Sequence, residues 1–123
     1  MYLGSLGTPR CTPPATFHGI QETGLDTTKG SFWALIFGQV PPPAGKDIKI
    51  VWRMTGSGAL RLVAADAQGK QVEPTEGPTP HEGSQWNRPG DEWGTIFYFP
   101  DPGCWTIEAH RDSGSGRLVI EVK

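Results

Sequence analysis

Alternating hydrophobic and polar positions run through much of the chain and predict β-strands. The clearest case is the segment 48–54, where Ile48, Ile50, Trp52 and Met54 share one face while a lysine and an arginine take the other. A period of two is typical of a strand with one buried face. Similar alternation covers 60–64, 104–110 and 117–122. A continuous apolar run at 32–37 predicts a strand buried on both faces.

Weaker patterns predict further strands at 16–20 and 93–99 and a short edge strand at 70–72. No segment sustains a period of 3.6 with helix caps, so we predict no α-helix. About seven short strands separated by turns indicate an all-β, antiparallel sandwich of two sheets. We expect one such domain over 16–123, preceded by an extended, proline-rich arm at 1–15.

Composition supports this fold and excludes some partners. The chain has 17 Gly and 12 Pro, as expected for many chain reversals, and its 11 Lys+Arg nearly balance 13 Asp+Glu. A balanced charge gives no basic surface for nucleic acid. No run approaches the roughly 20 apolar residues of a membrane span, so we expect neither nucleic acid nor a membrane span among its interactions.

Two cysteines bear on the compartment. Cys11 and Cys104 lie 104 − 11 = 93 positions apart, which excludes a CxxC motif. They either form a disulfide that ties the arm to the sandwich or remain two buried thiols. We expect the disulfide, and therefore a secreted or cell-envelope protein. Residues 1–7 lack the basic and apolar regions of a signal segment, so we expect Met1 to replace a removed leader.

The segment FYFPDPGCWTI at 97–107 carries a resemblance. It resembles the next-to-last hairpin of many bacterial exported immunoglobulin-like domains, in which an aromatic strand meets a Pro-Gly turn and a second alternating strand follows. The match covers about the last thirty residues. The whole chain is similar to uncharacterised secreted or lipoprotein β-sandwich proteins of bacteria. The resemblance implies an immunoglobulin-like sandwich and brings no catalytic residues.

The segment 73–92 has almost no apolar residues and predicts a long loop, a feature that is often functional. Trp86 stands there among polar neighbours, whereas Trp33, Trp52 and Trp105 lie in strand patterns that predict core positions. An exposed aromatic ring beside polar groups suits a carbohydrate or a protein or peptide ligand. We therefore assign the candidate ligand contacts to Trp86, Asn87, Arg88, Asp91, Trp93, His81 and Glu82. Alternatively, Trp86 folds back as a plug beneath its own loop.

Residues 88–91 predict a type II turn, with Gly90 at the position that needs a positive φ. This turn would hold Trp86 and Trp93 on its two flanks. It would also place polar side chains beside a bound ligand.

Enzymatic alternatives rest on few residues. A glycosidase would need Glu82 paired with Asp91 or Glu92 across a cleft, and a metal site would draw on the same acids with His81. Copper is disfavoured because Cys104 and His110 lie too far apart on one strand. We predict an exported binding or adhesion module with no catalytic residues, metal or cofactor. The alternatives are a structural accessory domain of an envelope assembly, then a metal-dependent or glycoside-cleaving enzyme. The sequence does not indicate the oligomeric state.

Overall fold

The computed structural model describes residues 15–17, 20–27, 30–84 and 86–123. These residues include ten strands and no helix. In chain order the strands are β1 (Ala15–Phe17), β2 (Ile20–Thr27), β3 (Gly30–Ile36), β4 (Asp47–Met54), β5 (Arg61–Ala65), β6 (Gln71–Val72), β7 (Glu76–Pro80), β8 (Asp91–Tyr98), β9 (Gly103–His110) and β10 (Ser115–Val122).

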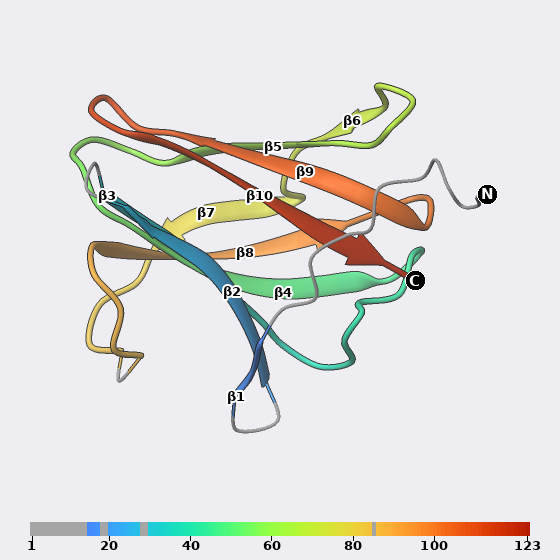
Figure 1. Ribbon diagram of the computed structural model, residues 1–123, viewed down its shortest axis with the longest axis horizontal. Coiled ribbons are helices and arrows are strands. Elements are labelled where there is room, and N and C mark those ends of the chain that lie inside the picture. The colour runs from blue at the N-terminus through green and yellow to red at the C-terminus, as the bar shows by residue number, and fades with distance from the viewer. Residues whose placement is uncertain (1–14, 18–19, 28–29, 85) are drawn as a thin grey trace.

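The strands form two antiparallel sheets. The larger sheet has six strands in the order β1-β2-β3-β4-β8-β7, and the smaller has four in the order β10-β9-β5-β6. In Figure 1 β5 and β6 run along the top of the molecule, with β4 and β8 below them. The predicted all-β, two-sheet antiparallel sandwich is confirmed. The structure has more strands than the seven or so predicted, mainly because the hydrophobic pattern of the sequence predicts neither β2 nor β7.

Aromatic side chains form the centre of the core between the sheets. Trp52 is fully buried, with its ring stacked 5.5 Å from that of Phe32 and edge-on to Phe97 at 6.0 Å. Its indole Nε1 donates a hydrogen bond of 2.8 Å to Thr95 Oγ1, which in turn donates to the carbonyl of Ile50. The predicted inward faces of β4, β9 and β10 are confirmed, because their alternate apolar residues belong to this core.

One face of β3 lies outside the core, which corrects the prediction for segment 32–37. Phe32, Ala34 and Ile36 are buried between the sheets, whereas Trp33 and Leu35 are only partly buried. The strand alternation turns Trp33 and Leu35 to the outer face of the six-stranded sheet, and Phe37 is likewise only partly buried. The prediction that Trp33 is a core residue is therefore wrong.

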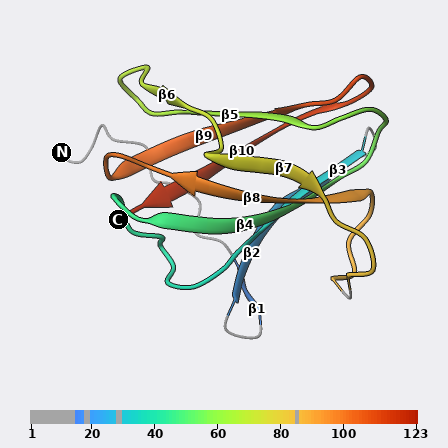
Figure 2. The same cartoon turned by 180° about the vertical axis from the view of Figure 1, so that it is seen from behind.

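A strand also interrupts the predicted loop 73–92. β7 pairs with β8 and forms an edge of the six-stranded sheet, with an irregular register between Glu76 and Thr79. Figure 2 shows β7 lying along β8. Edge strands tolerate proline and need few apolar residues, so the hydrophobic pattern did not reveal this one. The connection that remains between β7 and β8 is 81–90, and it projects from one end of the sheet (Figure 1).

The predicted disulfide concerns a residue outside the described range. Cys104 lies partly buried in β9, and no free cysteine is present in the part of the chain that the structure describes. Cys11 and nearly all of the predicted arm 1–15 fall outside the described residues. The pairing of Cys11 with Cys104 and the arm therefore stay predictions.

Candidate functional site

A glycine creates a depression in the outer face of the six-stranded sheet. Leu35 of β3, Val51 of β4 and Gly94 of β8 are neighbours across three adjacent strands. Gly94 has no side chain, and a Cβ built on it would meet no atom within 4 Å. A missing side chain in the middle of a strand leaves room for another group to approach the sheet.

Two adjoining hollows lie at this glycine, and both are lined by Lys49, His81 and Gly94. The inner hollow, of about 160 Å³, is also lined by Leu35, Phe37, Val51, Ser84, Trp86 and Glu92. The outer hollow, of about 280 Å³, is also lined by Glu76, Thr79, Pro80, Thr95 and Ile96. We refer to the two hollows together as the groove. Its size is at the lower end of the range for small-ligand sites, about 300 to 1,000 Å³.

Trp86 forms one wall of the inner hollow. Its side chain is partly buried, so it is neither as exposed as the predicted anchor nor as buried as the predicted plug. A tight local turn holds its backbone, because its N–H donates to Ser84 Oγ at 3.0 Å and its carbonyl accepts from the Arg88 N–H at 3.2 Å. The groove thus combines an aromatic wall, an aliphatic floor and polar groups at its rim.

A buried carboxylate lies at the side of the groove. The side chain of Glu92 is 3% exposed and binds two partners, with Arg53 Nε 3.0 Å from Oε1 and His81 Nδ1 2.6 Å from Oε2. Burying a carboxylate is costly unless its charge is paired and its oxygens are hydrogen-bonded, and both conditions are met here. His81 donates through Nδ1, so its Nε2 is the ring nitrogen that remains for a ligand.

The same arginine anchors the connection 81–90. Arg53 Nη1 donates to the carbonyls of Arg88 at 2.7 Å and Gly90 at 2.9 Å. Gly90 has a φ of +95°, as predicted for its turn position, and a Cβ there would collide with the backbone of Met54. The Arg88 guanidinium lies 4.0 Å from the centre of the Trp33 ring. These contacts fix the connection to the sheet at several points.

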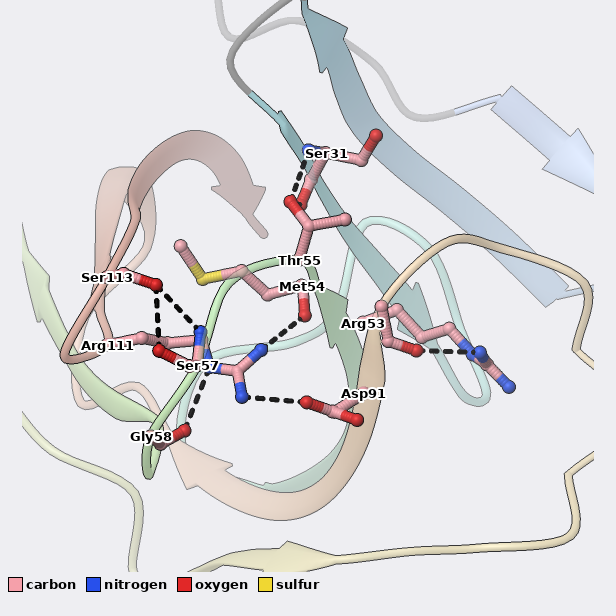
Figure 3. A network of polar contacts seen from close by, with 10 residues as sticks. Ser31, Arg53, Met54, Thr55, Ser57, Gly58, Asp91, Arg111 and Ser113 are labelled. Carbon is pink, nitrogen blue, oxygen red and sulfur yellow. Dashed lines mark hydrogen bonds and ion pairs between the residues drawn. The ribbon is translucent and has the colours of Figure 1, made fainter.

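Two predicted ligand contacts belong to a different network. Trp93 is only 5% exposed, because β8 turns it toward the core, so its assignment as a ligand contact is wrong. The Arg111 guanidinium lies 4.7 Å from its ring centre and pairs with Asp91 at 2.7 Å. Figure 3 shows Arg111 also donating to the carbonyls of Met54 and Gly58. This network joins β8 to the ends of β4 and β9, away from the groove.

The other predicted ligand contacts lie either at or beside the groove or in exposed positions away from it. His81 and Trp86 line the groove, and Arg88 stabilises the connection beside it. Asn87 and Glu82 are exposed and line neither hollow.

The acids proposed for an enzyme lie in different surroundings, and Glu82 is exposed outside both hollows. Asp91 pairs with Arg111, whereas Glu92 is buried between Arg53 and His81. Across the described ranges no three His, Cys, Asp or Glu side chains gather where they could hold a metal ion. Of the three acids proposed for an enzyme, Glu92 is the one that lines the groove.

Sequence reasoning missed the floor of the groove. Lys49, Val51 and Gly94 come from β4 and β8, strands that were predicted only as framework. Two signals were available. Val51 is an apolar residue on the otherwise polar side of its strand, and Gly94 interrupts an apolar strand. A glycine inside a strand often marks a place where another group approaches closely.

Comparisons with known proteins add information on the fold. No family model matches the chain, and neither does any curated protein. The chain is similar to a crystal structure described as a "Putative Lipoprotein from Bacillus anthracis", with a TM-score of 0.57 and 14% identity over 100% of this chain and 94% of the other. This likeness shows a shared fold. No helix among the described residues is long and apolar enough to cross a bilayer.

Proposed function

We propose that the protein is an exported, non-catalytic binding module and that the groove on the six-stranded sheet binds a carbohydrate. The observation that carries this proposal is the position of Trp86, which forms the wall of a hollow whose floor is opened by Gly94. Sugar rings present flat apolar faces and a rim of hydroxyls. An aromatic wall with nearby hydrogen-bonding groups is complementary to both features.

Preorganisation of the loop supports a binding role. The connection 81–90 is attached to the sheet through His81 at its start and through the carbonyls of Arg88 and Gly90 near its end. A loop that is ordered before binding loses less conformational entropy when the ligand arrives. Buried polar groups that already have partners also need no rearrangement.

The geometry favours a carbohydrate over an extended peptide. A peptide commonly binds by adding a strand to a sheet edge, and β7 is the edge beside the groove. Pro78 and Pro80 have no N–H to offer to such a strand, and the register of β7 is irregular. The adjoining face, with its aromatic wall, is the better binding surface.

An extracytoplasmic location is part of the same proposal. It is supported by the expected disulfide between Cys11 and Cys104 and by the resemblance of segment 97–107 to bacterial exported immunoglobulin-like domains. The similar fold of a structure described as a lipoprotein points the same way.

A glycan-binding screen followed by calorimetry tests the proposal. We expect wild type to bind an oligosaccharide, and Trp86→Ala to weaken that binding by at least about tenfold. The melting temperature of Trp86→Ala should fall by less than about 5 °C. Gly94→Val should fill the groove and abolish binding without unfolding the protein. Thr106→Val, on the outer face of the other sheet, is the matched control and should bind like wild type.

Three results would contradict the proposal. These are the absence of any bound oligosaccharide, unchanged binding by Trp86→Ala, and a collapse of the melting temperature in that variant. The last result would identify Trp86 as a structural plug.

A further inference from the structure

The inner hollow has an excess of positive charge. Its charged lining residues are Lys49 and Glu92, and Glu92 is already paired with Arg53 and His81 in a buried position. Lys49 forms no ion pair with any residue that the structure describes, and its side chain is exposed to solvent. A paired, buried carboxylate contributes little net field at the ligand, so the charge of Lys49 dominates the inner hollow.

Lys49 is also held beside the aromatic groups. Its Nζ lies 5.0 Å from the centre of the Phe37 ring, within the range of a cation–π contact. This contact restricts a long and otherwise mobile side chain. An ammonium group held in the same hollow as an aromatic wall is complementary to a sugar ring that carries a negative group.

His81 supplies a second polar atom at the same place. Its Nδ1 is bound to Glu92, which fixes the orientation of the imidazole and leaves Nε2 for a ligand. Both His81 and Lys49 line the inner and the outer hollow. The acid Glu76 lines only the outer hollow, so the two hollows differ in charge.

We propose that the inner hollow selects an acidic sugar, whose ring packs on Trp86, whose carboxylate binds Lys49 and one of whose hydroxyls donates to His81 Nε2. This inference rests on the proposed carbohydrate-binding function and adds the class of ligand. Charge-assisted hydrogen bonds to a carboxylate are about twice as strong as neutral ones, so the charge should produce a measurable preference. The volume of about 160 Å³ suits one ring rather than an extended chain.

Calorimetry with matched oligosaccharides tests this inference. The probes are an oligogalacturonate and a neutral galactose oligomer of equal length, measured in low and high salt. We expect wild type to prefer the acidic oligomer by on the order of tenfold, and high salt to reduce that preference. Lys49→Gln should remove the preference by weakening binding of the acidic oligomer far more than binding of the neutral oligomer. Lys46→Gln makes the same change of charge outside the groove and should behave like wild type.

The outcomes separate this inference from the proposed function. Equal binding of both oligomers, unaffected by Lys49→Gln, would overturn the charge preference while the carbohydrate site stands. Binding of an acidic peptide such as polyglutamate, with neither oligosaccharide bound, would overturn both. The absence of binding to every probe would also overturn both. A similar melting temperature for Lys49→Gln and wild type shows that any lost preference does not come from unfolding.

Discussion

The imidazole of His81 and the carboxylate of Glu92 lie 2.6 Å apart, although the His81 side chain is 59% exposed and that of Glu92 is 3% exposed. The histidine thus connects the surface of the groove to a buried anion. Arg53 binds the other oxygen of the same carboxylate and reaches the loop carbonyls. Glu92 therefore orients both the imidazole that lines the groove and the arginine that holds the connection 81–90.

Removing this charge should weaken both the fold and the groove. Glu92→Gln leaves Arg53 partly buried without its counter-charge, and we expect a loss of about 1 to 3 kcal/mol in the free energy of unfolding. Urea denaturation measures it. Glu82→Gln, in the exposed part of the same connection, is the control and should stay within about 0.5 kcal/mol of wild type. Equal stability of the two variants would show that the buried carboxylate has no structural role.

The central tryptophan should be among the most sensitive core positions. Trp52 is fully buried between Phe32 and Phe97. Trp52→Ala should therefore cost about 3 to 5 kcal/mol, through lost burial and the cavity left behind. Chemical denaturation followed by circular dichroism measures this loss. Thr95→Val removes the hydroxyl that accepts from the indole N–H and donates to the Ile50 carbonyl, and it should cost less, about 1 to 3 kcal/mol. A Trp52→Ala variant that is as stable as Thr95→Val would contradict the central role of the ring.

The alternation of β4 shows how much of the fold could be predicted. Ile48, Ile50 and Trp52 were assigned to the core because a strand between a buried and an open face has a period of two. The same rule failed for β3, where Trp33 and Leu35 are apolar although they face outward. Periodicity records hydrophobicity, and it cannot distinguish the core from an apolar patch on the surface.

The candidate site could be predicted only in part, because it joins distant segments. Trp86 and His81 stood out as unusual residues in a polar connection. Lys49 and Gly94 gained their positions from the pairing of β4 with β8, which the sequence does not specify. For Trp93 the error is the opposite, because a residue that lies elsewhere was assigned to the site. Trp93 is close to Trp86 along the chain, but the alternation of β8 turns its side chain into the core.

The expected disulfide can be tested directly. A bridge between Cys11 and Cys104 would close a loop of about ninety residues and stabilise the fold by about 4 to 5 kcal/mol in the chain-entropy model. Mass spectrometry of protein folded under oxidising conditions should show one intramolecular disulfide. Cys104→Ser should lower the melting temperature, and Cys11→Ser should lower it by a similar amount. Two free thiols in wild type would contradict the bridge and weaken the case for export.

The ion pair between Lys70 and Asp101 predicts a pH dependence at alkaline pH. The hydrogen bond to Asp101, and then its charge, raise the pKa of Lys70 from the ordinary 10.5. A raised folded-state pKa stabilises the protein below pH 10.5, and the contribution is lost as the pH rises through the folded-state value. Both groups are exposed, so the contribution is small. Asp101→Asn should be slightly less stable than wild type in urea at neutral pH, and the difference should disappear as the pH rises through the raised folded-state pKa of Lys70. A difference that grows with pH would reverse the sign of this linkage.

Two glycines near the groove should respond to substitution in opposite directions. Gly94 has an ordinary φ for a strand and open space at its Cβ position, so Gly94→Val should raise the free energy of unfolding by about 0.5 to 1 kcal/mol through reduced chain entropy. Gly90 has a φ of +95°, and its Cβ would meet the backbone of Met54. Gly90→Val should therefore lower stability by more than about 1 kcal/mol. Urea denaturation of both variants measures the two signs. A destabilised Gly94→Val would mean that the depression in the sheet is closed in solution, and the groove could not then serve as a binding site.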